Sequence, residues 1–403
     1  MANQVVVLGG GAAGFLAAIT CAEADRDARV LILEKSQHVL AKVRVSGGGR
    51  CNVTHACFDP ATLVQHYPRG GKALRGPFTR FQPRDTMAWF EQRGVRLKTE
   101  ADGRVFPVTD RSETIVACLL DAARTAGVEV RTGVHIRSVT KPGRFRIELA
   151  DADPCPADRV LLATGSSPQG HRWAAALGHT IEPPVPSLFT FAVDDARLRD
   201  LPGVSVPKAT IALTGTRLEQ TGPILITHWG LSGPAVLKLS AWAARELAER
   251  RYRAEVSIDW LPDLNAEQLR QRVNAVRTEL ARQLVGSSSP LGLPSRLWQR
   301  LADAAGIGAE QRWTSVSNRQ VADLVHELSR GAFQITGKGA FKEEFVTCGG
   351  VRLDEVAFMT MESRRCPGLY FAGEILDIDG VTGGFNFQSA WTTGWLAGQA
   401  MGA

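Results

Sequence analysis

The chain has 403 residues, of which 44% are hydrophobic and 22% charged, and its formal net charge is +6. This composition is ordinary for a globular protein of two or three domains and excludes a largely disordered chain. No segment offers about twenty uninterrupted apolar residues, so a membrane span is not predicted. The first 22 residues are uncharged, but they contain four glycines and lack a basic leading segment. We therefore interpret them as a strand and a turn rather than an export signal, and expect a cytoplasmic protein.

The cysteines indicate a reduced protein. Seven of them are scattered through the chain, at positions 21, 51, 57, 118, 155, 348 and 366. An odd number at these spacings fits neither a disulfide framework nor a Cys-x-x-Cys zinc pattern. Free thiols are expected, and no metal site is predicted.

A glycine-rich turn follows the first apolar run, in the sequence Val-Val-Val-Leu-Gly-Gly-Gly-Ala-Ala-Gly of residues 5–14. The spacing Gly9-x-Gly11-x-x-Gly14 is typical of dinucleotide-binding turns, in which the glycines allow a tight turn, a close pyrophosphate and a helix packed on the strand. Ala12 and Ala13 begin the expected helix, Ala12–Ala24, whose N-terminus would face the anion with free N–H groups. The turn therefore predicts a pyrophosphate site.

A second strand, Arg29–Leu33, follows at the length that a βαβ unit requires and ends at Glu34, twenty residues after Gly14. A carboxylate at this point accepts hydrogen bonds from an adenosine ribose. Its charge would repel a 2′-phosphate, which favours FAD or NAD over NADP. The alternative is an ordinary solvated charge at a strand end.

Residues 41–54 contain too many glycines for a helix and too much charge for a buried strand. We expect a loop that wraps around a ligand. Three successive glycines at 47–49 would expose backbone N–H groups, and Lys42, Arg44 and Arg50 would place cations beside them, which suits a phosphate or an anionic ring. The alternative is a flexible surface loop.

The next segments alternate between helix and strand. Periodicity predicts helices at 86–93 and 112–126, the latter capped by Ser112. Strands are expected at 95–99, 128–131, 134–139, 145–149 and 158–163, with a hairpin-like segment at 103–107. The strand at 158–163 ends in Thr164-Gly165, small residues that would let the backbone approach a ligand near the first turn.

The segment between Asp59 and Asp85 carries basic side chains and no acidic ones. Its cations are Arg69, Lys72, Arg75, Arg80 and Arg84. Such a window suits a nucleic acid or an anionic substrate, or it forms a solvated basic face.

The character of the chain changes from about residue 188. Short alternating runs at 189–193, 210–213 and 222–227 predict antiparallel strands of a separate β domain. Between about 263 and 327 the pattern becomes helical, with Leu269, Val273, Val276 and Leu280 on one face. His228 is the most conspicuous histidine, and we weigh a catalytic role against that of a structural hydrogen-bonding residue beside Trp229.

The C-terminal region repeats the pattern of a buried strand with a glycine exit, at 368–374. Residues 376–388 then lead into a helix expected at 389–399. A second helix N-terminus facing a ligand is what a flavin ring requires, because its N1/C2=O edge becomes negative on reduction. Glu374 or Asp377 could hold ribityl hydroxyls, and Gly383, Gly384 and Asn386 could present backbone N–H groups to the ring. A site built from both ends of the chain implies a discontinuous nucleotide domain.

Several longer motifs are more specific than the glycine turn. They are Ser-Gly-Gly-Gly-Arg-Cys-Asn-Val-Thr at 46–54, Gly-Arg-Val-Phe-Pro at 103–107, Thr-His-Trp-Gly-Leu-Ser-Gly-Pro at 227–234, Gly-Gly-Val at 349–351 and the run 370–388. Together they resemble the BaiN/RdsA-type FAD-dependent oxidoreductases, which include aminoacetone oxidase-like proteins and belong to the glutathione-reductase-like FAD superfamily. The resemblance extends over nearly the whole chain.

The resemblance implies an α/β fold in which a discontinuous Rossmann-like FAD-binding domain, 1–187 and 338–403, is interrupted by an antiparallel β-barrel domain. The barrel would comprise 188–262 and 328–337 and carry a small helical insert at 263–327. Non-covalent FAD would contact the turn of Gly9, Gly11, Ala12, Ala13 and Gly14, then Glu34, Lys35, Lys42, Ser46, Gly47, Gly49, Arg50, Cys51, Asn52, Ile136, Ala163, Thr164, Gly165, Gly373, Glu374, Asp377, Gly383, Gly384, Phe385 and Asn386.

These features favour an oxidoreductase in which flavin N5 passes a hydride between a small organic substrate and NAD(P)H or oxygen. Because the chain has no second dinucleotide fingerprint, NADH or NADPH would bind transiently. Three alternatives stay open: a nucleic-acid-directed, tRNA-modifying flavoprotein, a dithiol oxidoreductase using Cys51 and Cys57, and a non-catalytic flavin-binding module. A nucleic-acid partner is disfavoured. His228 and Cys51 are the catalytic candidates, and the substrate and oligomeric state are not predicted.

Overall fold

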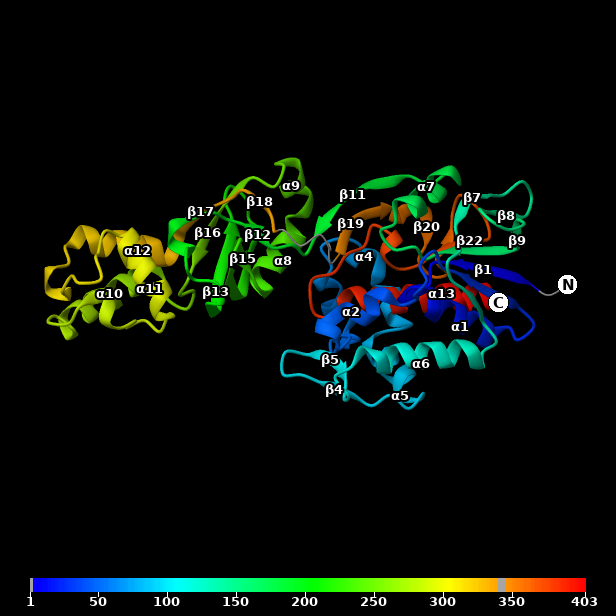
Figure 1. Ribbon diagram of the computed structural model, residues 1–403, viewed down its shortest axis with the longest axis horizontal. Helices are drawn as coiled ribbons and strands as arrows, with labels where there is room; N and C mark the ends of the chain where they lie inside the picture. Colours follow the sequence, from blue (N-terminus) through cyan, green and yellow to red (C-terminus); the bar gives the residue numbers. More distant parts are fainter. Residues whose placement is uncertain (1–2, 340–345) are drawn as a thin grey trace. The chain divides into compact units, whose positions relative to one another are not determined.

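The computed structural model describes residues 3–339 and 346–403. The chain divides into two compact units, a first unit of Met1–Val185 with Val346–Ala403 and a second unit of Pro186–Phe345. The first unit thus joins the blue N-terminal elements of Figure 1 to the red C-terminal helix. The predicted return to the nucleotide domain at 338 runs through residues 340–345, which lie outside the described residues.

A mainly parallel sheet forms the centre of the first unit. Its strands β22, β10, β1, β2 and β6 are parallel, and β20 and β21 extend it as antiparallel strands beside β22. Val5, Val6 and Val7 are fully buried, as expected for strands covered on both faces. The strands in spatial order are β20 (Val356–Ala357), β21 (Glu362–Ser363), β22 (Leu369–Phe371), β10 (Arg159–Leu162), β1 (Gln4–Leu8), β2 (Arg29–Leu33) and β6 (Glu129–Arg131).

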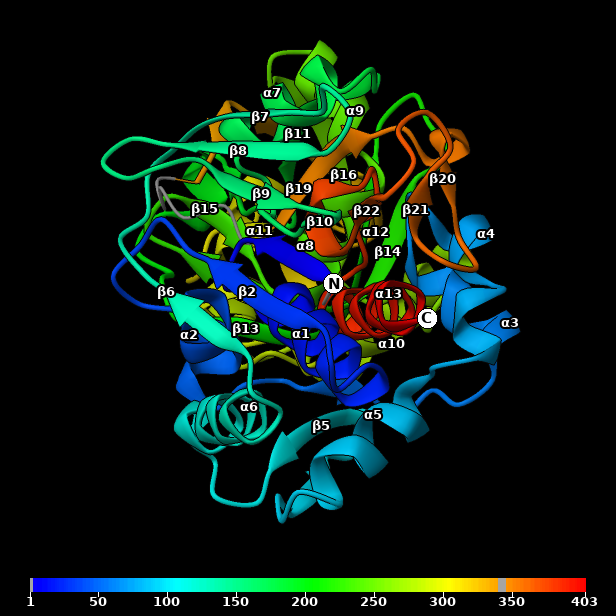
Figure 2. The same ribbon diagram turned by 90° about the vertical axis from the view of Figure 1, so that its right-hand side faces the viewer.

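Two helices from opposite ends of the chain pack side by side against this sheet, and Figure 2 views them nearly end-on. They are α1 (Ala12–Ala24) and α13 (Phe385–Gly402). Glycines at every fourth position of α13 meet small residues at every fourth position of α1, so the axes approach closely. The register rises in the same direction on both helices, which makes them parallel. The pairs are Gly394 with Ala13, Gly398 with Ala17 and Gly402 with Cys21.

The first unit contains further helices and strands. They are α2 (Ala41–Gly49), β3 (Thr54–His55), α3 (Pro60–Leu63), α4 (Gly71–Leu74), α5 (Pro83–Glu91), β4 (Leu97–Thr99), β5 (Arg104–Pro107), α6 (Ser112–Thr125), β7 (Ile136–Thr140), β8 (Phe145–Leu149), β9 (Cys155–Ala157), α7 (Pro168–Ala176), β11 (Ile181–Ser187) and β19 (Val346–Val351). Sheet β3-β5-β4 and sheet β7-β8-β9 are antiparallel.

Three local predictions were wrong. Residues 41–49 begin as helix α2 and only then turn, with Gly47 and Gly48 in left-handed conformations. In the helix before Gly127 the N-cap position is Arg111, without a capping side-chain bond, and Ser112 is already helical with its hydroxyl donating to the Arg44 carbonyl at 2.7 Å. Helix α13 begins at Phe385 rather than residue 389, since Gly384 already provides a left-handed N-cap.

The second unit contains an antiparallel sheet and a group of helices. The predicted strands and the helical stretch are present, and Leu269, Val273 and Val276 are buried on one face as expected. The sheet order is β17 (Gly331–Ile335), β16 (Ala254–Asp259), β13 (Ser205–Leu213), β14 (Glu219–Thr227), β15 (Gly230–Ser232), β12 (Phe191–Ala192) and β18 (Gly337–Lys338). The helices are α8 (Pro234–Trp242), α9 (Ala244–Glu249), α10 (Ala266–Glu279), α11 (Ser295–Ala304) and α12 (Asn318–Arg330).

Candidate functional site

In the glycine turn after β1, Gly9 and Gly14 leave no room for a side chain, whereas Gly11 faces open space. A Cβ atom on Gly9, whose φ is +113°, would lie 2.4 Å from the Ala163 carbonyl oxygen, and one on Gly14 would lie 2.1 Å from the Gly9 oxygen. At Gly11 an added Cβ would meet no described atom within 4 Å. Because Gly11 is the N-cap of α1, the free N–H groups of the first helical turn face this open space, as an anion site requires.

Glu34 lies at the end of β2 beside this turn. Its carboxylate accepts the Gly10 N–H at 2.7 Å through Oε2 and the Ser36 N–H at 2.7 Å through Oε1. Each carboxylate oxygen retains a lone pair for another donor. The neighbouring Lys35 is exposed.

The segment after α2 is tied directly to the N-terminus of α13. Asn52 Oδ1 accepts the Gly384 N–H at 3.0 Å, and its Nδ2 donates to the Thr54 carbonyl at 2.9 Å, in the amide orientation that these two partners dictate. The Cys51 N–H donates to the Ser46 oxygen at 3.0 Å, and a Cβ on Gly47 would lie 2.9 Å from the Asn52 nitrogen. The expectation that the Gly384 N–H faces a flavin is therefore wrong, because Asn52 already accepts it.

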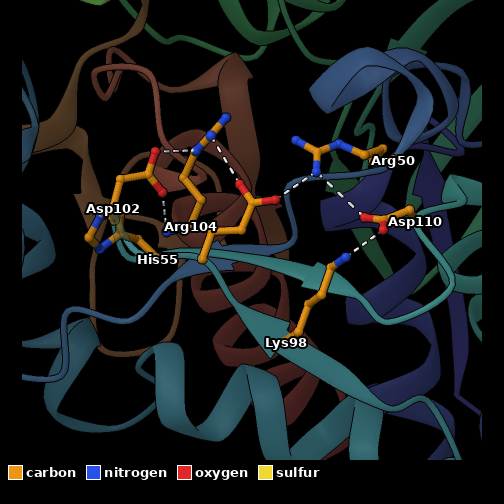
Figure 3. Close-up of polar contacts among 7 residues, drawn as sticks. Arg50, His55, Lys98, Asp102, Arg104 and Asp110 are labelled. Carbon is orange, nitrogen blue, oxygen red and sulfur yellow. Dashed lines mark hydrogen bonds and ion pairs between the residues drawn. The ribbon is translucent and has the colours of Figure 1, made fainter.

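Arg50 belongs to a chain of ion pairs on the β3-β5-β4 sheet, shown in Figure 3. Its Nη1 lies 2.7 Å from Glu100 Oε1 and 3.5 Å from Asp110 Oδ1, and its guanidinium carbon lies 3.9 Å from the Phe106 ring centroid. The chain continues from Glu100 to Arg104 at 3.0 Å. Arg50 was expected to offer a free cation to a phosphate, but two carboxylates and a ring already hold it.

The same network continues to both sides of Arg50 and Arg104. Lys98 pairs with Asp110 and lowers the pKa of that carboxyl through a hydrogen bond. On the other side Arg104 Nε donates to Asp102 at 2.7 Å, and the His55 ring nitrogen Nε2 lies 3.1 Å from the Asp102 carbonyl oxygen. The residues drawn in Figure 3, together with the unlabelled Glu100 among them, therefore link the loop that carries Arg50 to His55 of β3.

Three predicted site residues from distant segments converge at the carboxyl end of the sheet. Lys42 forms an ion pair with Glu374, and Glu374 Oε1 also accepts the Thr347 N–H at 3.0 Å. A Cβ on Gly165 would lie 3.6 Å from Glu374 Oε2. Lys42, which was expected to offer a cation to the ligand, is thus paired with Glu374. Glu374 was itself predicted to hold ribityl hydroxyls.

The end of β10 carries a polar atom that the protein leaves unpaired. Thr164 Oγ1 is buried and has no hydrogen-bond partner among the described residues. Ala163 donates its N–H to the Leu8 oxygen at 2.9 Å, which keeps this end beside the glycine turn. Ile136 is buried on β7, and its carbonyl accepts Gln169 Nε2 at 2.5 Å. The Thr164 hydroxyl fits a site that a ligand group completes.

The turn before α13 packs against a cluster of rings. Phe385 lies nearly parallel to His55 and His66, with centroid separations of 4.7 and 4.3 Å. Asn386 closes the preceding turn by accepting the Gly380 N–H and donating to the Gly380 carbonyl, both at 2.8 Å. Neither histidine was singled out by sequence reasoning, because a ring stack between residues far apart in the chain leaves no local signal.

Other predicted residues of this region have structural partners. The Gly373 N–H donates to Thr393 Oγ1 at 2.9 Å, and a Cβ on Gly373 would lie 2.9 Å from the Ala13 Cβ. The Asp377 N–H donates to the Val351 oxygen at 3.1 Å. A Cβ on Gly383, whose φ is +128°, would lie 3.0 Å from the Phe385 ring.

The parallel packing of α1 and α13 sets the spacing of their two N-termini. Gly394 is level with Ala13, so α13 begins about eight residues before the level at which α1 begins. At 1.5 Å per residue the α13 N-terminus therefore lies about 12 Å farther along the common axis. Two positive helix ends point the same way at this spacing. Such an arrangement suits an extended ligand that places an anionic group at each helix N-terminus.

The two catalytic candidates lie in unlike surroundings. Burial raises the pKa of the Cys51 thiol to about 12, so it stays protonated at neutral pH, and both Cys51 and Cys57 are free thiols. Burial thus disfavours the thiolate that a nucleophilic Cys51 would need. His228 is exposed at the turn between β14 and β15 in the second unit, where it lines an open groove of about 890 Å³ together with Trp229 and Arg199.

The basic window contains one cation that is not available at the surface. Arg69 is largely buried and pairs with the fully buried Asp379. The other four cations, Lys72, Arg75, Arg80 and Arg84, are exposed. Two of them lie over rings, with Arg80 5.9 Å from the Trp395 ring centroid and Arg84 5.3 Å from that of Phe58.

A glycine turn at the carboxyl end of a parallel sheet, with a second helix start beside it, defines a Rossmann-type nucleotide-binding protein. Residues 3–400 match the family model described as the HI0933-like protein Rossmann domain. The chain belongs to the HI0933-like family, and with it to the BaiN/RdsA-type FAD-dependent oxidoreductases that the motifs resemble. Within the described residues, each helix is too short or too polar to cross a bilayer.

The relatives that match nearly the full chain include two kinds of enzyme. The chain is 32% identical to a 3-dehydro-bile acid delta(4,6)-reductase of Clostridium scindens, over 99% of this chain and 98% of that one. It is 31% identical to a ribosomal RNA dihydrouridine synthase of Escherichia coli, over 98% and 97%. In fold it is similar to a 3-ketosteroid-delta4-(5alpha)-dehydrogenase of Rhodococcus jostii, with a TM-score of 0.54 at 16% identity, over 100% of this chain and 97% of that one.

Proposed function

We propose that this protein is an FAD-dependent reductase that delivers a hydride to a carbon–carbon double bond conjugated with a carbonyl group. The observation that carries the proposal is the pair of parallel helix N-termini, one open at Gly11 and one at the start of α13, about 12 Å apart along their axis. FAD has a pyrophosphate and a ring edge that becomes negative on reduction, and these are the two groups such ends stabilise.

The residues present fit this cofactor. The turn of Gly9, Gly11 and Gly14 would bind the pyrophosphate, and the lone pairs left on Glu34 would accept the adenosine ribose hydroxyls. Lys42, Glu374 and Thr164 would line the ribityl chain. When bound, FAD supplies hydride transfer through N5, so the chain itself needs to orient the substrate and exclude water.

The first turn of α13 would set the charge preference of the ring. Gly384 donates to Asn52, so the donors that would face the ring are the N–H groups of Phe385, Asn386 and Phe387, which have no intrahelical acceptor. We further propose that FAD contacts the other site residues predicted from the sequence. The proposal also includes a β-barrel domain made of residues 188–262 and 328–337.

The names of the relatives support the substrate class. A delta(4,6)-reductase acting on a 3-dehydro steroid and a dihydrouridine synthase both add two hydrogens across a double bond conjugated with a carbonyl. NADH or NADPH would supply the electrons and would bind transiently.

A second candidate places that double bond in a uracil base of RNA. It is favoured by the ribosomal RNA named in the Escherichia coli relative and by the exposed cations between Lys72 and Arg84. Cations beside rings suit single-stranded nucleic acid.

The test is anaerobic reduction of the purified protein. We expect a yellow protein that NADH or NADPH bleaches, and that a 3-keto-4-ene steroid or a uridine-containing RNA oligonucleotide reoxidises, with the saturated product found by mass spectrometry. Reoxidation by the oligonucleotide alone supports the second candidate. A protein that neither binds FAD nor accepts electrons from either nicotinamide contradicts the proposal, and one reoxidised only by oxygen contradicts the substrate class.

A further inference from the structure

Gln388 is a fully buried polar side chain in the first full turn of α13, and both its amide oxygen and its amide nitrogen have hydrogen-bond partners. Its Oε1 accepts from the Thr54 hydroxyl at 2.6 Å and the Thr86 hydroxyl at 3.0 Å. Its Nε2 donates to Thr392 Oγ1 at 3.0 Å. The amide therefore connects β3, α5 and α13 at one buried point.

This amide is part of a stripe along α13 that binds three successive residues, 52–54, at the start of β3. The Gly384 N–H donates to Asn52 Oδ1, Gln388 accepts from the Thr54 hydroxyl, and Trp391 Nε1 donates to the Val53 carbonyl at 2.9 Å. Residues 384, 388 and 391 are four and then three positions apart, so they lie on one face of the helix.

The stripe fixes where α13 begins. The Gln388 N–H makes the first intrahelical bond, to the Gly384 oxygen at 3.0 Å. The two ends of this turn are thus held by Asn52 and Thr54, and the free N–H groups of the turn lie between them. A shift of the helix along or about its axis would move these donors together and would break the Gln388 bonds.

We propose that Gln388 is a positioning residue for the flavin, one that sets how strongly the α13 N-terminus prefers reduced over oxidised FAD. The inference rests on the proposed placement of the flavin at this helix. Gln388 acts through the helix start, because its amide is buried among Thr54, Thr86 and Thr392. Helix N–H groups stabilise developing negative charge only when they are correctly aimed, so a change in their position alters the reduced state more than the oxidised state.

The experiment compares Gln388→Met with Gln388→Glu and with a matched control. Methionine keeps the length but removes the acceptor for two buried hydroxyls, whereas glutamate keeps that acceptor. Ser240→Ala is the control: Ser240 is fully buried in the second unit and also makes two hydrogen bonds, from the Phe189 N–H at 2.9 Å and to the Leu237 carbonyl at 2.8 Å. FAD affinity, midpoint potential and melting temperature are measured for each holoprotein.

We expect Gln388→Met to bind FAD with a tenfold smaller preference for the reduced form, which is a fall of about 30 mV in the midpoint potential of a two-electron couple. Gln388→Glu keeps the acceptor but introduces a carboxylate whose negative charge opposes reduction, so its potential should fall at least as far as that of Gln388→Met. Ser240→Ala should melt earlier with an unchanged potential. If Gln388→Met fails to fold, Thr86→Val removes one of the same bonds while leaving Gln388 in place, and it should lower the potential in the same direction.

A native potential in Gln388→Met, or in Thr86→Val where that variant is used, would overturn the inference and leave Gln388 a purely structural residue. Wild-type protein that does not bind FAD would instead overturn the proposed function. The two failures are thus distinguishable, because the potential of a variant can be compared only when the wild-type protein binds FAD and its FAD can be reduced.

Discussion

Gly394 of α13 lies so close to Ala13 of α1 that a Cβ atom added to Gly394 would stand 2.6 Å from the Ala13 carbonyl oxygen. A glycine is required because any side chain would push the helices apart. This contact and its repeats at Gly398 and Gly402 bring residues nearly 400 positions apart into one element of the site. The candidate cofactor site depends on this pairing, since each helix supplies one of the two positive ends.

Replacing Gly11 with valine should abolish FAD binding without unfolding the protein. The side chain would occupy the open space where a pyrophosphate would approach, and Gly11 has an ordinary extended backbone, with φ −91°. Compared as apoproteins, the variant and the wild type should melt within about 2 °C, as for surface substitutions. FAD content after gel filtration and circular dichroism check both parts.

The control is Gly14→Val, whose side chain would collide with the Gly9 carbonyl, so it should cost about 1–3 kcal/mol of stability even without cofactor. Full FAD content in Gly11→Val would place the pyrophosphate elsewhere.

Replacing Gly384 with alanine should weaken FAD binding and lower the flavin midpoint potential by tens of millivolts, at about 30 mV per tenfold change. The new Cβ would lie 2.5 Å from the Thr54 oxygen, and φ is +95°, so the helix start must move. Gly94→Ala is the control, because Gly94 has φ +83° and no described atom within 4 Å of an added Cβ. Spectroelectrochemistry gives the potentials, and a native potential in Gly384→Ala would separate this turn from the ring.

Cys57→Ser should leave the rate of flavin reduction unchanged. Cys51 is fully buried and its thiol has a pKa of about 12, so it cannot form the thiolate that a dithiol mechanism needs. Stopped-flow bleaching by a nicotinamide measures the rate, and iodoacetamide labelling with mass spectrometry should find Cys51 unmodified in the native protein. Loss of most turnover in Cys57→Ser, or an isolated Cys51–Cys57 disulfide, would restore the dithiol alternative.

Stability should fall as the pH drops from about 7 to 5. Burial lowers the pKa of His171 below its usual value of 6.5, so the unfolded chain takes up a proton in this range before the folded protein does. Each pKa unit of difference between the two states is worth about 1.4 kcal/mol below both values. Glu355 adds to the slope at lower pH, because the Thr180 N–H and nearby cations hold the pKa of its carboxyl down against burial.

Melting curves across this range measure the effect. The exchange His171→Phe should flatten the slope between pH 7 and 5.5, whereas the exposed His38→Gln should not. An equal slope in all three proteins would show that His171 titrates normally.

Local sequence patterns predicted the secondary structure well where it depends on residues that are neighbours in the chain. The helix Ala12–Ala24 and the strand Arg29–Leu33 were predicted with the observed bounds, because a glycine turn between apolar runs leaves few alternatives. The start of α13 was misplaced by four residues, since Asn386 closes a turn that reads as a continuing loop. The ion pairs could not be predicted, because Arg50 and Arg69 find their partners 50 and 310 positions away.

The parallel pairing of α1 with α13 also determines when, during synthesis of the chain, the two halves of the site can come together. During synthesis the glycine turn leaves the ribosome about 370 residues before the helix that completes its site, a wait of roughly 20 to 70 s at about 5–20 residues per second. Throughout that interval the small-residue face of α1 has no partner. A nascent chain therefore lacks one of the two helix N-termini until α13 has emerged, so with the proposed cofactor placement FAD binding would follow the synthesis of Phe385–Gly402.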